Sequence, residues 1–186
     1  MSILESIKEE VMILNKEYMS TSEDSYNFWE EHIKYVVQES LELAKTYGTD
    51  IEIVELAALL HDIALMSKTG TRLEHHVNGA NIARNLLTKY GYQEEKLNKV
   101  AKCILNHRSS KNSTSIEELC VADADILAHF DNILMVASNA IGNSSSLPET
   151  RKKLRDAFEY DYKDLSDKTQ KVFNERYRTI CHVVLG

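Results

Sequence analysis

Apolar residues recur every three or four positions along most of the chain, which is the spacing of one face of an α-helix. The first such pattern lies within residues 1–19 and opens with a capping box formed by Ser2 and Glu5. The second begins at about Asn27 and ends at Gly48, a residue type common just after helix C-termini. These patterns predict two amphipathic helices at the start of the chain.

The stretch Leu56 to Leu65, LAALLHDIAL, is apolar on nearly every side except at His61 and Asp62. It predicts a buried central helix, which a capping box of Thr49 and Glu52 would open. An ionised group buried without a partner is penalised by several kcal/mol or more. The His–Asp pair therefore needs hydrogen-bonding partners or a metal ion.

Other helical patterns carry candidate partners for this pair. His32 lies on the apolar stripe of the second helix, although a lone histidine there is more often a buried structural residue than a ligand. A fourth helix begins with His75 and His76, and a fifth ends at His107. His107 in that position could also serve only as a partner of the helix dipole.

A sixth helix carries Asp123 and Asp125 among apolar residues, and the segment GNSSSLP that follows is the clearest break in the chain. Residues 147–186 predict a tail of one or two helices. We therefore predict an all-α fold, a compact bundle of about seven or eight helices, in a single domain over residues 1–186.

Composition narrows the class of ligand. The net charge is −7 and no dense basic run is present, so the chain lacks the electrostatic footprint of a nucleic-acid binder and we expect a small-molecule ligand. No stretch approaches ~18 uninterrupted apolar residues, so we expect neither a signal peptide nor a membrane span, no membrane partner, and a cytoplasmic location. The oligomeric state stays open.

An apolar helix ending in His61 and Asp62, with His32 one helix earlier and Asp125 of ADADIL two helices later, resembles the HD-domain superfamily of metal-dependent phosphohydrolases. The family pattern is H…HD…D on an all-helical core. The resemblance covers about residues 28–133 and implies that these four side chains bind a divalent metal ion.

Some members of this superfamily hold two metals with two further histidines. The segment HVNGANIARNLL, starting at His76, and NHRS around His107 look similar to those sites. The resemblance implies a second ion with Asp62 bridging the two, while His75 should point about 100° away and be exposed. The alternative is that His76 and His107 only orient ligands or contact phosphate.

The resemblance leaves details of the metal site open. Two imidazoles and two carboxylates suit Mn, Fe, Mg, Co, Ni or Zn, as one or two ions. Asp123 is the alternative to Asp125 as the last ligand, and His129, one helical turn after Asp125, could orient it.

The sequence differs from many members of that superfamily after the His–Asp pair, because Leu65 stands three residues after Asp62, where many of them carry a polar residue. An acid or phosphate contact must therefore come from another residue. We predict Asp62 as a catalytic residue and Lys68 and Arg72 as phosphate-binding residues, with Arg108 and Lys111 as further candidates. The alternative for these cations is an ordinary solvated surface.

These observations predict a metal-dependent phosphohydrolase that cleaves a phosphoester or phosphoanhydride of a small, nucleotide-like molecule. One alternative is an HD-fold di-iron oxygenase, since some proteins of this fold use the same six-ligand set to activate O₂. Another is a metal- or ligand-binding module without catalysis, which Leu65 would favour.

Overall fold

The computed structural model describes residues 2–185, which are mostly α-helical and contain no β-strand, so the all-α prediction is confirmed. None of the helices in this range has both the length and the apolar composition needed to cross a membrane. The helices in chain order are α1 (Ile3–Thr21), α2 (Lys34–Tyr47), α3 (Ile51–Leu60), α4 (Ile63–Met66), α5 (His75–Lys89), α6 (Glu94–Asn106), α7 (Ile116–Asp131), α8 (Ile133–Gly142), α9 (Leu147–Asp164) and α10 (Asp167–Leu185).

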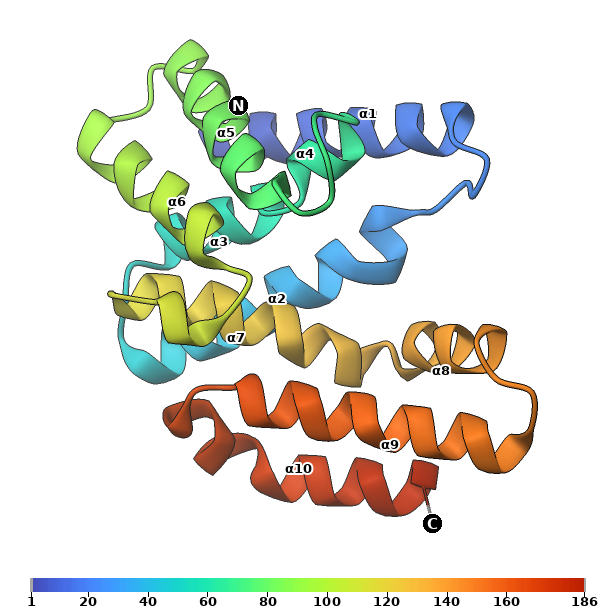
Figure 1. Ribbon diagram of the computed structural model, residues 1–186. Coiled ribbons are helices and arrows are strands. Elements are labelled where there is room, and N and C mark those ends of the chain that lie inside the picture. The colour runs from blue at the N-terminus through green and yellow to red at the C-terminus, as the bar shows by residue number, and fades with distance from the viewer. Residues whose placement is uncertain (1, 186) are drawn as a thin grey trace.

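Helices α2 and α7 pack along each other through the middle of the molecule (Figure 1). Helices α1, α3, α5 and α6 lie on one side of this pair, and the hairpin of α9 and α10 lies on the other. Phe130 of α7 anchors the hairpin, because its ring lies 5.2 Å from that of Phe158 and 5.0 Å from that of Phe173, centroid to centroid. The middle pair is thereby buried from both sides.

The predicted central helix is interrupted at His61 and Asp62. Helix α3 ends at Leu60, His61 is its C-cap, and Asp62 leaves helical geometry with φ −103° and ψ 15° before α4 begins. A second interruption, at Asn132, separates α7 from α8. Such breaks explain why the structure has slightly more helices than predicted.

The N-cap of α3 differs from the prediction. The side chain of Asp50 accepts hydrogen bonds from the backbone N–H groups of Glu52 and Ile53, so Asp50 caps the helix. The hydroxyl of Thr49 donates instead to Glu117 on α7. The predicted capping box of Thr49 and Glu52 is therefore wrong, because the carboxylate one position later is the acceptor that the helix uses.

Candidate metal centre

His61 and Asp62 lie in the interior, with exposed fractions of 0% and 8%. The Nδ1 atom of His61 lies 2.8 Å from the carbonyl oxygen of Ala58, one turn back in α3. A carbonyl can only accept, so Nδ1 carries a proton and Nε2 is the nitrogen left to act as a ligand. The end of α3 thus aims a ligand atom, rather than a donor, away from the helix.

The same arrangement occurs at two other histidines. The Nδ1 atom of His75 donates to the carbonyl of Arg72 at 2.6 Å, and that of His107 to the carbonyl of Ile104 at 2.6 Å. Both are buried residues at the ends of helices, His75 at the start of α5 and His107 at the C-cap of α6. Backbone carbonyls therefore fix three imidazoles with Nε2 as the free nitrogen.

One group of donors forms around His32, which lies in a π-helical turn before α2. Its Nε2 atom is 3.1 Å from Nε2 of His61, 2.9 Å from Oδ1 of Asp125 and 3.8 Å from Oδ2 of Asp62. Oδ2 of Asp62 is also 3.6 Å from Nε2 of His61. Two imidazoles and two carboxylates from three helical segments thus face one point.

A second group forms on the other carboxylate oxygen of Asp62. Its Oδ1 atom lies 3.4 Å from Nε2 of His75, and Nε2 of His75 lies 3.0 Å from Nε2 of His107. Asp62 is therefore common to both groups, and we call them the first group (His32, His61, Asp62, Asp125) and the second group (Asp62, His75, His107).

The donor chemistry of both groups fits a cation. Nε2 of His75 and Nε2 of His107 both present lone pairs across 3.0 Å, and two acceptors do not attract each other without a proton or metal ion between them. The ligand atoms of His32, His61 and Asp62 lie within 4.8 Å of one another, as do those of Asp62, His75 and His107. Each set could hold a metal ion, and nitrogen with carboxylate oxygen suits divalent first-row metals.

Electrostatics keeps these ligands in the forms that bind metal. Burial alone would raise the pKa of the Asp62 carboxyl, but the imidazoles of His61 and His32 hold it below its ordinary value. The pKa of Asp125 is likewise depressed against burial by the hydrogen bond from His32. Burial, reinforced by His61, lowers the pKa of His107 to about 4. The carboxylates are ionised and His107 is neutral at neutral pH.

The placement predicted for the two histidines at the start of α5 is wrong. His75 is buried in the second group, whereas His76 lies outside both groups and lines a separate cavity of about 410 Å³ beside Arg108. Gly79 explains the register, because a Cβ there would lie 3.2 Å from the carbonyl oxygen of His61. The helix face that contacts the end of α3 therefore contains Gly79 and, four residues earlier, His75.

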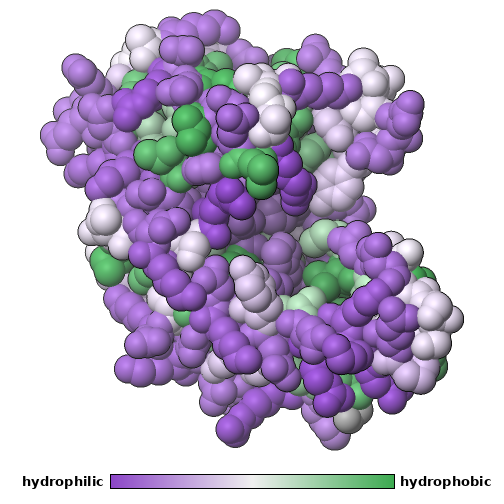
Figure 2. All heavy atoms as spheres, in the orientation of Figure 1, coloured by the Kyte–Doolittle hydropathy of each residue, from purple (hydrophilic) through white to green (hydrophobic). Residues whose placement is uncertain are grey.

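A cavity of about 710 Å³ opens over the two groups, and the surface is hollowed where α8 lies opposite the connection between α1 and α2 (Figure 2). Arg72 and Arg108 line it, and Arg108 is held by a hydrogen bond to the carbonyl of Leu73. Lys68 does not line it: its ammonium bonds both oxygens of Thr21 at 3.0 Å. Four aromatic side chains also line the cavity: Tyr18, Tyr26, Phe28 and Tyr160.

The two aspartates of ADADIL have separate roles. Asp125 belongs to the first group, whereas Asp123 accepts hydrogen bonds from the backbone and hydroxyl of Ser166 and from the hydroxyl of Thr169. Burial raises the pKa of Asp123 although these donors oppose the shift. Asp123 therefore fastens the turn between α9 and α10, and the alternative that it is the last ligand is not supported by its position.

His129 makes a contact that the sequence did not indicate. Its Nδ1 atom lies 2.9 Å from Oδ2 of Asp161 on α9, and its ring stacks on that of His32. Burial would lower the pKa of His129, but the hydrogen bond and the charge of Asp161 raise it. Nothing in the local sequence could identify Asp161, because 32 positions and the whole of α8 separate the two residues.

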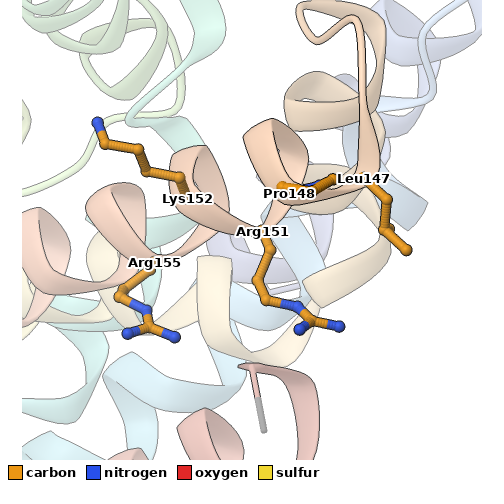
Figure 3. Close-up of a pocket in the computed structure, with 5 residues that line it drawn as sticks. All are labelled: Leu147, Pro148, Arg151, Lys152 and Arg155. Atoms are coloured by element: carbon orange, nitrogen blue, oxygen red, sulfur yellow. The ribbon is translucent and has the colours of Figure 1, made fainter.

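Another cavity, of about 340 Å³, lies on the N-terminal part of α9 (Figure 3). The side chains drawn there supply positive charge but no histidine, cysteine or carboxylate. It therefore has none of the groups that bind a metal ion, and the chemistry of the described residues gathers around Asp62. The residues that line this cavity are Leu147, Pro148, Arg151, Lys152 and Arg155.

Comparisons with known proteins identify the fold and the family. A crystal structure from an uncultured Thermotogales bacterium, of a protein named predicted HD superfamily hydrolase, has the same fold, with a TM-score of 0.58 and 24% identity over 90% of this chain and 91% of that one. An uncharacterized protein of Clostridium beijerinckii is 29% identical over 89 residues, which span 47% of this chain and 55% of that protein. The family model of the HD domain matches residues 29–129, more than half of the sequence. The chain therefore belongs to the HD-domain family.

Proposed function

We propose that this protein is a metal-dependent phosphohydrolase, which cleaves a phosphoester or phosphoanhydride of a small, nucleotide-like molecule. One observation carries the proposal: two groups of ligand side chains share Asp62 at the base of a cavity whose wall bears Arg72 and Arg108. The fold shared with a protein named a predicted hydrolase supports it.

The residues of the two groups would hold the metal. His32, His61, Asp62 and Asp125 would bind one ion, and Asp62 would share a second with His75 and His107. A divalent ion such as Mn, Fe, Mg, Co, Ni or Zn would supply Lewis acidity toward water and the phosphoryl group. Backbone carbonyls already fix the orientation of three of the imidazoles, so these side chains would lose little conformational entropy when a metal ion binds.

The cavity wall supports the proposed substrate class. The guanidinium groups of Arg72 and Arg108 can bind phosphoryl oxygens in pairs, with fixed geometry. The aromatic rings on the same wall present flat apolar surface, against which a nucleobase can stack. The Lys68 ammonium is bound to Thr21, so we assign phosphate binding to Arg108 in place of Lys68.

A screen of phosphorylated metabolites with Mn²⁺, Mg²⁺, Co²⁺ or Fe²⁺ tests the proposal. We expect phosphate release from at least one nucleotide-like compound, and loss of that release in Asp62→Ala. The matched control is Asp156→Ala, an exposed carboxylate of α9 that belongs to neither group and does not line the cavity. Full metal-dependent activity in Asp62→Ala would show that the site is misassigned.

A second candidate is an oxygenase, because a carboxylate shared between two histidine-containing groups also suits a pair of iron ions that activate O₂. Parallel assays with and without O₂ separate the two. A hydrolase turns over equally in both, whereas turnover that consumes O₂ would refute the phosphohydrolase. A blank metabolite screen would favour a binding module, the role that Leu65 beside the site suggests.

A further inference from the structure

His129 lines the cavity over the two groups but belongs to neither of them. Its Nδ1 atom is engaged by Asp161, so the ring orientation is set and Nε2 is the nitrogen left to meet a ligand. The side chain is 34% exposed, so a molecule in the cavity has access to it. The ring also stacks on His32 of the first group, with centroids 6.2 Å apart, which places it close to the reacting centre.

The carboxylates that line the cavity already have hydrogen-bond partners or belong to the first group. Asp24 accepts hydrogen bonds from the hydroxyl of Tyr18 and from the backbone N–H of Tyr26. Asp62 and Asp125 belong to the first group. Among the described residues that line the cavity, His129 is thus the imidazole outside both groups, and it is backed by a carboxylate.

We propose that His129 is a catalytic residue that contacts the leaving-group oxygen of the substrate through Nε2, and that Asp161 is the residue that positions it. This assignment rests on the phosphohydrolase function proposed above. It gives a role to α9, which lies outside the segment that matches the HD-domain model.

His129 and the two arginines line the same cavity from different elements. Arg72 precedes α5 and Arg108 follows α6, whereas His129 lies on α7 and its partner Asp161 on α9. A phosphoryl group held by the arginines and the two groups would lie in the cavity that His129 also lines, so its departing oxygen can contact Nε2.

In the proposed reaction, water displaces the leaving group from phosphorus. The oxygen of the attacking water forms a bond to phosphorus, and the bond between phosphorus and the leaving oxygen breaks with its electron pair on that oxygen. The leaving oxygen takes the proton from Nε2 of His129, the attacking water releases one proton to solvent, and the imidazole regains one from solvent. Asp161 stabilises the ring while both of its nitrogens carry protons.

A series of phosphate monoesters tests the assignment: p-nitrophenyl phosphate, whose leaving group needs no proton, phenyl phosphate, and glycerol phosphate, whose leaving group needs one most. His129→Ala should lower kcat for glycerol phosphate by about 100-fold or more, the usual contribution of a general acid, and for p-nitrophenyl phosphate only a few fold. Metal content should match that of the parent.

Matched variants separate catalysis from structure. Asp161→Asn keeps an acceptor for Nδ1, so it should lose less kcat than Asp161→Ala, with KM unchanged in both. His182→Ala, on an exposed histidine of α10, should behave as the parent. If His129→Ala loses its helical circular dichroism, His129→Gln replaces it, because glutamine keeps the bulk and can donate a hydrogen bond but gives up no proton.

An active parent whose His129 variants lose the same factor on all three esters, or lose metal, would overturn the assignment and leave the hydrolase intact. A parent that hydrolyses no phosphate compound with any of the metals would overturn both proposals.

Discussion

The first and second groups share Asp62 but differ in their donors and in their place in the fold. The first has two imidazoles and two carboxylates, whereas the second has two imidazoles and only the shared carboxylate. The first should bind its ion more tightly, since it supplies more charge and more ligands. The second leaves more coordination positions open, so we expect it to be the group that adapts to substrate.

Their surroundings differ in the same sense. Asp125 lies on α7 and His32 in the turn that leads into α2, and α2 and α7 pack together through the middle of the molecule. His75 and His107 instead lie at helix ends, next to loops whose side chains are largely exposed. Loops and helix ends open more readily than packed helices, so the second group should be the more mobile of the two.

Removal of the shared carboxylate should have the largest effect on this pair of groups. Asp62→Ala should lose both ions and lower turnover by more than about 100-fold, the upper range for changes in the surroundings of a metal ligand. Elemental analysis together with a phosphate-release assay measures both quantities. A variant that kept one ion would show that one group binds metal without Asp62.

The two neighbouring aspartates of α7 provide a matched pair for the first group. Asp125→Ala should remove one ion with little change in fold. Asp123→Ala should keep the metal but lower the free energy of unfolding by about 3 kcal/mol, because Ser166 and Thr169 lose a buried acceptor. Urea unfolding with metal analysis distinguishes them, and metal loss in Asp123→Ala would contradict the assignment.

Much of this arrangement could be predicted from the sequence. The helical periods, the break after α8 and the convergence of His32, His61, Asp62 and Asp125 follow from local patterns and from the resemblance to HD proteins. Asp125 lies within the long helix α7, and His32 in the turn that leads into α2, where burial of one face leaves little freedom of register. His61 and Asp62 lie where the apolar run of α3 ends.

Other details depend on contacts that local sequence does not specify. Gly79 could have indicated His75, because close packing of a glycine marks the buried face and the residue four positions earlier shares it. No comparable signal identifies Asp161 or the contact of Lys68 with Thr21, since each joins segments that meet only in the folded chain.

Lowering the pH should have a smaller effect that also distinguishes the two groups, because only the second group contains His107. The pKa of His107 is lowered to about 4, so between that value and its ordinary 6.5 the unfolded chain binds a proton that the folded chain does not. Stability is therefore lost as the pH falls through this window, by about 2 kcal/mol at pH 5 for this residue in metal-free protein. The free energy of unfolding, measured with urea, should fall less steeply in His107→Gln than in the parent as the pH is lowered. Identical pH dependences in the two proteins would contradict this.

The most direct test of the shared-carboxylate centre is the metal content of anaerobically purified parent, His75→Ala and His76→Ala. With two groups joined at Asp62 and His75 in the second, these proteins should hold about two, one and two ions per chain. One ion in the parent, or loss of an ion in His76→Ala but not in His75→Ala, would contradict the account.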